Sequence, residues 1–144
     1  MTYRHPSTPY VCELRFSGTP TQIAYTYTLT ILQQTVANLL TVSNNTDLNL
    51  PAGHYYAQAL GDFTRPAPGH WTTARTNQMH WFLDGNQIGK VGGSDYHANE
   101  SCDAAECAFT LHSSGVLTLR QTASANGSLS WTSDAIAYVW RVPR

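Results

Sequence analysis

A strict two-residue alternation in residues 22–31, "QIAYTYTLTI", constrains the fold more than any other feature of this chain. Its apolar positions are Ile23, Tyr25, Tyr27, Leu29 and Ile31, and an alanine or a threonine separates each from the next. A helix would scatter these side chains around its circumference, whereas a strand places them all on one face. The segment therefore predicts a β-strand with one buried face.

The same period marks three other segments. In "TPYVCELRF", residues 8–16, Leu14 and Phe16 share a face. In "HYYAQALGDF", residues 54–63, Tyr55, Ala57 and Ala59 share a face. Because two of these side chains are small, they predict that this strand is closely packed. In "TVANLLTV", residues 35–42, the pattern fits either a strand or a short helical turn.

Turn residues divide the second half of the chain. "QMHWFLDGNQIGKV", residues 78–91, predicts a hairpin whose Asp84-Gly85 pair suits a type I′ turn. "CAFTLHSSGVLTLRQTA", residues 107–123, predicts a second hairpin that turns near Ser114-Gly115. Residues 64–76 and 92–106 are expected to be long surface loops.

The closing segment "DAIAYVWRVPR" is apolar on both faces of the strand it predicts. One face carries Ile136, Tyr138, Trp140 and Val142, and the other carries Ala135, Ala137, Val139 and Arg141. A strand of this kind is expected to be covered on both sides. We expect the core to cover one side and a neighbouring subunit to cover the other.

Together these segments predict an all-β chain of eight to ten short antiparallel strands in a two-sheet sandwich. The length of 144 residues fits a single domain, residues 1–144, in which residues 1–8 form an N-terminal arm. No internal repeat indicates a solenoid or a propeller.

Charge and composition exclude several classes of partner. Only 12% of the residues are charged, where about 25% is usual, and the net charge is −1. No basic stripe predicts nucleic-acid binding. No apolar run resembles a signal peptide or a membrane span, so no membrane insertion is expected.

Histidine and cysteine do not form a recognisable metal or catalytic pattern. The densest group is His97, Glu100, Cys102, Asp103, Glu106 and Cys107, whose spacing matches no zinc knuckle or ribbon. We therefore expect no metal and no cofactor. The three cysteines favour free thiols over a small loop closed between Cys102 and Cys107.

His54, Tyr55 and Tyr56 follow a Pro-Ala-Gly hinge and raise the question of a substrate pocket. No nucleophile, base and orienting group can be named around them, and there is no Gly-x-Ser-x-Gly elbow. We expect a strand here and no enzymatic activity, although an uncharacterised hydrolase remains a third interpretation.

Several phrases resemble those of a known family. The hinge phrase is Leu50, Pro51, Ala52, Gly53 and Tyr55; the hairpin phrase is Trp81, Leu83, Asp84 and Gly85; the others are residues 109–111, residues 115–120 and the closing "YVWRV". In order and spacing, across about residues 9–142, they resemble the trimeric jelly roll of the tumour-necrosis-factor and complement globular-head type. The resemblance is closest to the versions found on bacteriophage capsids and at fibre tips.

This resemblance implies a jelly-roll sandwich that assembles as a homotrimer. Because we find no coiled-coil heptads, collagen-like repeat or tail-docking domain, we expect a capsid decoration or cement protein on the virion surface, bound to the major capsid protein. The alternative is a receptor- or carbohydrate-binding head of a phage tail fibre. The residues expected in the core or at the trimer interface are Tyr56, Trp81, Tyr138 and Trp140. Those expected to contact a partner from the loops are His70, Trp71, Arg75, His97 and Glu100.

Overall fold

The computed structural model describes residues 10–17, 26–60, 63–64, 76–95, 101–124, 130–131 and 135–142. These residues form thirteen antiparallel strands, and nine of them are at least four residues long. The fold class expected from the alternation, an all-β antiparallel jelly-roll sandwich, is confirmed. No helix among these residues is long and apolar enough to cross a membrane.

The first sheet has the strand order β2-β1-β13-β5-β10. Its strands are β1 (Tyr10–Ser17), β2 (Thr28–Gln34), β5 (Gly53–Leu60), β10 (Ala105–Leu111) and β13 (Ile136–Val142). The closing strand β13 therefore lies in the middle of this sheet, between β1 and β5.

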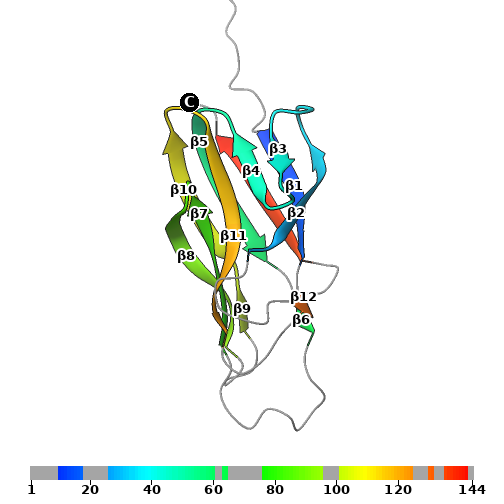
Figure 1. Ribbon diagram of the computed structural model, residues 1–144, viewed down its shortest axis with the longest axis vertical. Helices are drawn as coiled ribbons and strands as arrows, with labels where there is room; N and C mark the ends of the chain where they lie inside the picture. Colours follow the sequence, from blue (N-terminus) through cyan, green and yellow to red (C-terminus); the bar gives the residue numbers. More distant parts are fainter. Residues whose placement is uncertain are drawn as a thin grey trace, which may run out of the picture.

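The second sheet has the strand order β8-β7-β11-β4-β3. Its strands are β3 (Thr41–Ser43), β4 (Asp47–Leu50), β7 (Thr76–Leu83), β8 (Asn86–Asp95) and β11 (Gly115–Ser124), and β9 (Ser101–Asp103) pairs with β8. The strands of both sheets follow the long axis of the molecule (Figure 1). A separate pair, β6 (Phe63–Thr64) with β12 (Ser130–Trp131), lies toward the end of the sandwich where β5 finishes.

The predicted alternation is what fills the core. Along β1, Tyr10, Cys12, Leu14 and Phe16 are buried while the residues between them are not. The described part of the 22–31 segment has the same pattern, because its alternate residues Tyr27 and Leu29 are buried. The small-residue face of β5 is also buried, since Ala57 and Ala59 have no exposed surface. The other buried apolar residues are Leu40, Leu48, Leu50, Tyr55, Ala57, Ala59, Met79, Trp81, Ala105, Cys107, Leu111, Leu117, Leu119, Ala135, Ala137 and Val139.

Polar atoms inside this core have partners. The Trp81 indole Nε1–H donates to the carbonyl oxygen of Ala105 at 2.9 Å. The Tyr27 hydroxyl donates to Oε1 of the buried Gln121 at 2.6 Å. Burial of these groups is tolerated because each hydrogen bond offsets the loss of hydration.

The two sheets are joined where β10 passes β8, and also where the residues before β2 reach β11, since Thr26 forms a bridge with Arg120 and the Tyr27 N–H donates to the Leu119 carbonyl oxygen at 2.9 Å. At the first of these junctions, only Glu106 and Lys90 are paired. Two glycines of β8 make this approach possible: a Cβ at Gly89 would lie 2.1 Å from the Glu106 carbonyl oxygen, and one at Gly92 would lie 2.2 Å from the Ala105 nitrogen. Since no side chain fits in either place, the glycines determine where the sandwich closes.

The first predicted hairpin is confirmed. Strands β7 and β8 pair across a turn in which Asp84 has φ 48° and Gly85 has φ 84°, as a type I′ turn requires. The Asp84 carboxylate also accepts a hydrogen bond from the Val116 backbone N–H at 2.9 Å, which fastens the turn to β11.

The second predicted hairpin is wrong in its pairing. A turn does lie at residues 112–114, but β10 pairs with β5 and β8, whereas β11 pairs with β4 and β7. The turn is a corner at which the chain leaves one sheet for the other. Both arms still bury their apolar faces, so the alternation alone fits either arrangement.

Two other segments also differ from expectation. The predicted loop 92–106 is largely strand, because β8 continues to Asp95, β9 covers Ser101–Asp103 and β10 begins at Ala105. The ambiguous segment 35–42 is turns over residues 35–40, with Asn38 at φ 62°, followed by β3. The N-terminal arm, residues 1–8, and most of the loop predicted at residues 64–76 lie outside the described residues.

Candidate interaction surface

The face of the first sheet that points away from the core carries a row of apolar side chains. Trp140 of β13 lies opposite Val11 of β1 on one side and Tyr56 of β5 on the other, and Tyr56 lies opposite Ala108 of β10. Residues directly opposite one another in an antiparallel pair project from the same face. The row therefore crosses four strands, and we call this side of the sheet the outer face.

Aromatic rings gather at the centre of the outer face. The ring centroids of Tyr56 and Trp140 are 5.3 Å apart at an interplanar angle of 43°, and those of Tyr138 and Trp140 are 5.6 Å apart at 27°. All three side chains are half-buried within the single chain. Trp81 differs from them, because it is fully buried between the sheets.

The apolar character continues toward both ends of these strands. Leu60 is 46% exposed and Val142 is 48% exposed, which is unusual for large aliphatic side chains of a core sheet. Exposed apolar side chains that gather on one face mark a site of interaction with another surface more often than scattered ones do. The closing strand predicted from the sequence is confirmed, with Ala137 and Val139 on its buried side, while the cover of its other side by a neighbouring subunit stays a prediction.

Polar groups flank the aromatic centre on both sides. Gln33 Nε2 donates to the Glu13 carboxylate at 3.2 Å, and Gln58 Nε2 donates to the Glu106 carboxylate at 3.1 Å. Burial and the neighbouring Glu106 carboxylate raise the pKa of the Tyr56 hydroxyl. The outer face is thus an apolar centre with a polar margin, the composition typical of protein–protein interfaces.

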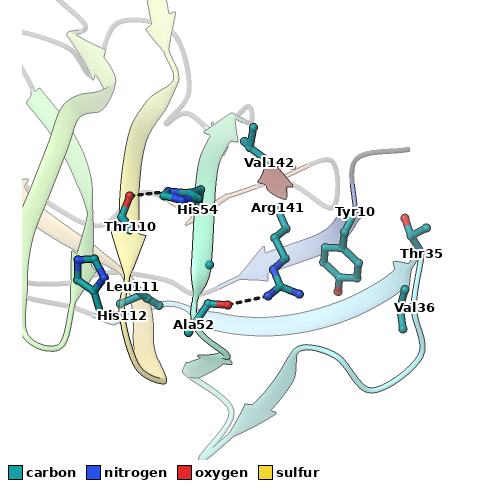
Figure 2. A pocket seen from close by; sticks show the side chains of 11 residues that line it. Tyr10, Thr35, Val36, Ala52, His54, Thr110, Leu111, His112, Arg141 and Val142 are labelled. Carbon is teal, nitrogen blue, oxygen red and sulfur yellow. Dashed lines mark hydrogen bonds between the residues drawn. The ribbon is translucent and has the colours of Figure 1, made fainter. Parts of the chain in front are cut away.

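A second feature is a depression at the end of the sandwich where β5 begins and β13 ends (Figure 2). Its volume is about 830 Å³. On one side of β5, Arg141 reaches toward the hinge and its Nη2 donates to the Ala52 carbonyl oxygen at 2.7 Å, with Tyr10 beside it. On the other side, His54 Nδ1 and the Thr110 hydroxyl are hydrogen-bonded at 2.7 Å.

The hinge before β5 is held from inside the sandwich. The Tyr55 hydroxyl donates to the Pro51 carbonyl oxygen at 2.6 Å, and its ring stacks on Phe109. Burial raises the pKa of Tyr55, and the Arg141 guanidinium opposes that rise. The three consecutive residues at the hinge thus divide their roles: Tyr55 packs inward, while His54 and Tyr56 face outward.

The sequence predicts four residues in the core or at an interface, and the structure describes the position of all four. Trp81 lies in the core, and Tyr56, Tyr138 and Trp140 form the aromatic centre of the outer face. The five loop residues His70, Trp71, Arg75, His97 and Glu100 lie outside the described residues.

The cysteine and metal expectations concern partly described residues. Cys12 and Cys107 are buried free thiols, so Cys107 is not bonded to Cys102. Burial raises the pKa of Cys12 to about 11 and that of Cys107 to about 12. In the described portion of the chain, no three His, Cys, Asp or Glu side chains gather as ligands for a metal ion.

Several residues that contribute to these two features are not predicted from the sequence as site residues. Val11 and Ala108 extend the outer face, and Tyr10, Gly53 and Arg141 meet in the depression, although they are far apart along the chain. The alternation shows which residues share a strand face but not which strands become neighbours. The sequence does offer one sign of the depression, because Arg141 is a charged residue on the otherwise buried side of the closing strand.

Comparison with known proteins supports the fold. No model of a known protein family matches the sequence, and no curated protein matches it. Crystal structures of murine APRIL at pH 8.0, pH 8.5 and pH 5.0 are similar, with TM-scores of 0.64, 0.61 and 0.55 and sequence identities of 12%, 12% and 13%. Each match covers 94% of this chain and 100% of the other. The architecture is a tumour-necrosis-factor-like jelly roll.

Proposed function

We propose that the chain assembles as a homotrimer through its outer face. The observation that carries this proposal is the aromatic centre of Tyr56, Tyr138 and Trp140 on the middle strands of a sheet whose other side is already buried in the core. Within one chain these rings are left half-buried. Contact with further copies of the same face would remove the remaining apolar surface from water, at about 25 cal/mol per Å².

We further propose that this trimer is a non-enzymatic decoration protein, which binds the major capsid protein on the outside of a bacteriophage shell. Support comes from the hinge phrase at residues 50–55 and the closing strand, which resemble those of phage capsid proteins with this fold. A decoration trimer would hold the shell through many shallow contacts, each repeated three times.

Light scattering coupled to size-exclusion chromatography tests the assembly. We expect three times the chain mass of 15.9 kDa, and we expect Trp140→Glu to give the mass of one chain with an unchanged β-sheet circular dichroism spectrum. Val91→Glu is the matched control, because Val91 is an exposed valine of the second sheet and its change should leave the trimer intact. A wild-type mass of one chain would disprove the assembly.

Antibody labelling of virions tests the location. Antibodies against the chain, used in electron microscopy of phage particles that contain it, should label the shell evenly. Labelling confined to the tips of tail fibres would support the alternative role instead. Virions without any label would contradict both roles.

The alternative function is a receptor- or carbohydrate-binding head of a tail fibre. The depression at the end of the sandwich favours it, because a concave site with a few polar groups is where small ligands bind. Specific binding of the isolated protein to glycans or to host cells would support this alternative over decoration of the shell.

A further inference from the structure

The depression beside the Pro51-Ala52-Gly53 hinge has the size of a small-molecule site. Its volume of about 830 Å³ falls within the roughly 300–1,000 Å³ of known ligand pockets. Strands that are distant in the sequence build it, because Tyr10 comes from β1, Thr110 from β10 and Arg141 from β13. The sandwich scaffold therefore fixes the relative positions of the lining side chains.

Arg141 is the charged centre of this depression. Its guanidinium is held by the Ala52 carbonyl oxygen, and among the described residues it contacts no carboxylate. A Cβ placed on Gly53 would lie 2.7 Å from Arg141 Nε, so a larger residue at this position would require the guanidinium to shift. The cation is thus half-buried and positioned while most of its N–H groups remain available for an anion.

Among the described residues that line the depression, none has an acidic side chain. Hydroxyl groups are supplied by Tyr10, Thr35 and Thr110, and imidazoles by His54 and His112. The Tyr10 hydroxyl already donates to Gln34 and the Thr110 hydroxyl contacts His54. The depression therefore combines one fixed cation with several groups that donate or accept hydrogen bonds.

Apolar side chains complete the walls. Val36 is 52% exposed at one end of the depression and Val142 is 48% exposed, and the buried Leu111 lies on the far side of the hinge. Such surfaces pack against the carbon skeleton of a ligand, whereas a simple inorganic anion would leave them in water. The ligand that fits has a carboxylate, several hydroxyl groups and an apolar ring face.

From this geometry we propose that the depression binds an acidic sugar, with the carboxylate of a uronic acid unit on the Arg141 guanidinium. A guanidinium matches a carboxylate through paired N–H···O hydrogen bonds, which are stronger and more selective than those of an ammonium. The histidines and hydroxyl-bearing residues would then receive the ring hydroxyls. This inference deepens the alternative function, the carbohydrate-binding head, and is independent of the proposed trimer because binding does not depend on how the subunits assemble.

Nuclear magnetic resonance titration of the full-length protein with sodium glucuronate tests the proposal. We expect saturable shifts of residues around the hinge, and no such shifts with methyl glucoside, which lacks the carboxylate. Arg141→Gln should weaken glucuronate binding by at least about tenfold, because a charge-assisted hydrogen-bonded pair is lost. Arg141→Lys keeps the positive charge but loses the paired N–H groups of the guanidinium. It should therefore weaken glucuronate binding less than Arg141→Gln does.

Arg15→Gln is the matched control, because Arg15 is an exposed arginine of β1 outside the depression and its change should leave binding unaltered. Should Arg141→Gln fail to fold, Thr35→Val and His112→Ala probe the same site on exposed positions and should each weaken binding. The proposal is overturned if glucuronate causes no saturable shifts, if methyl glucoside binds equally well, or if inorganic phosphate binds and glucuronate does not.

Discussion

At the scale of single residues, the core of this protein is notable for the polar atoms it accommodates. The Trp81 indole and the Tyr27 hydroxyl are buried, and each donates to an acceptor distant in the sequence. The Trp81 acceptor is the Ala105 carbonyl at the start of β10, next to the edge where β8 and β10 meet. This indole therefore links the packing of the core to the closure of the sandwich.

Substituting Trp81 should show both contributions. Trp81→Phe removes the donor and leaves the Ala105 carbonyl buried without it, which should cost about 1–3 kcal/mol. Trp81→Ala adds a cavity and should cost about 3–5 kcal/mol. Urea unfolding measures both values, and Val91→Ala, at an exposed position, should stay within about 0.5 kcal/mol of the wild type. A Trp81→Phe protein as stable as the wild type would show that the hydrogen bond contributes nothing.

The buried thiols predict a dependence of stability on alkaline pH. Burial raises the pKa of Cys12 to about 11 and that of Cys107 to about 12, above the ordinary value of 9.0. The unfolded chain therefore loses these protons first as the pH rises. The contribution of the protonated thiols to the free energy of unfolding is complete below pH 9.0. It declines as the pH rises toward 11, by up to about 1.4 kcal/mol per pH unit for each thiol.

Unfolding free energies between pH 8 and pH 11 measure this decline. A variant with both Cys12→Ala and Cys107→Ala should lose less stability over that interval than the wild type. Tyrosines with raised pKa, such as Tyr10 and Tyr55, titrate with the same sign, so part of the slope should persist. Identical slopes for the two proteins would contradict the role given to the thiols.

At the scale of strands, the sequence predicts local structure better than pairing. Alternation located β1, β5 and β13, and Asp84-Gly85 located the β7–β8 turn, because each signal resides in adjacent residues. The corner at residues 112–114 was predicted as a hairpin, since a short turn between two apolar arms has the same local pattern in both cases. The choice between a hairpin and a corner depends on the pairing of β10 with β5 and of β11 with β7, and these partner strands lie far away in the sequence.

The candidate surfaces show the same limit. The sequence predicts Tyr56, Trp81, Tyr138 and Trp140 together for the core or the trimer interface, but it does not separate the fully buried Trp81 from the three on the outer face. The depression was not predicted, because Tyr10, Gly53 and Arg141 meet only when the first strand, the hinge and the closing strand are side by side. No spacing along the chain encodes that meeting.

The sheet junction gives a prediction for two glycines. Gly85 and Gly89 both have positive φ, at 84° and 76°, but a Cβ meets nothing within 4 Å at Gly85 and backbone at 2.1 Å at Gly89. Gly85→Ala should cost roughly 1–3 kcal/mol for conformational strain alone. Gly89→Ala should cost more, because β8 and β10 must separate. The melting temperatures of the two variants check this. Equal decreases in melting temperature would contradict the steric clash expected at Gly89.

At the scale of the whole molecule, the proposed assembly has a thermodynamic consequence. If folding is coupled to association, the melting temperature of the wild type should rise with protein concentration. Trp140→Ala should weaken the association and reduce this dependence, while it disturbs the single chain little because Trp140 is half-buried there. Calorimetry over a hundredfold range of concentration measures the effect. Melting that is independent of concentration would argue against a trimer held by this face.

The central position of β13 also bears on how this protein folds. Because β13 pairs with both β1 and β5, each of these strands keeps one edge of unpaired backbone groups until β13 is in place. The pairing of β1 with β13 joins residues 10–15 to residues 136–141, and contacts between segments so far apart in the sequence form slowly. Aggregation through the open strand edges competes with folding until that pairing is complete.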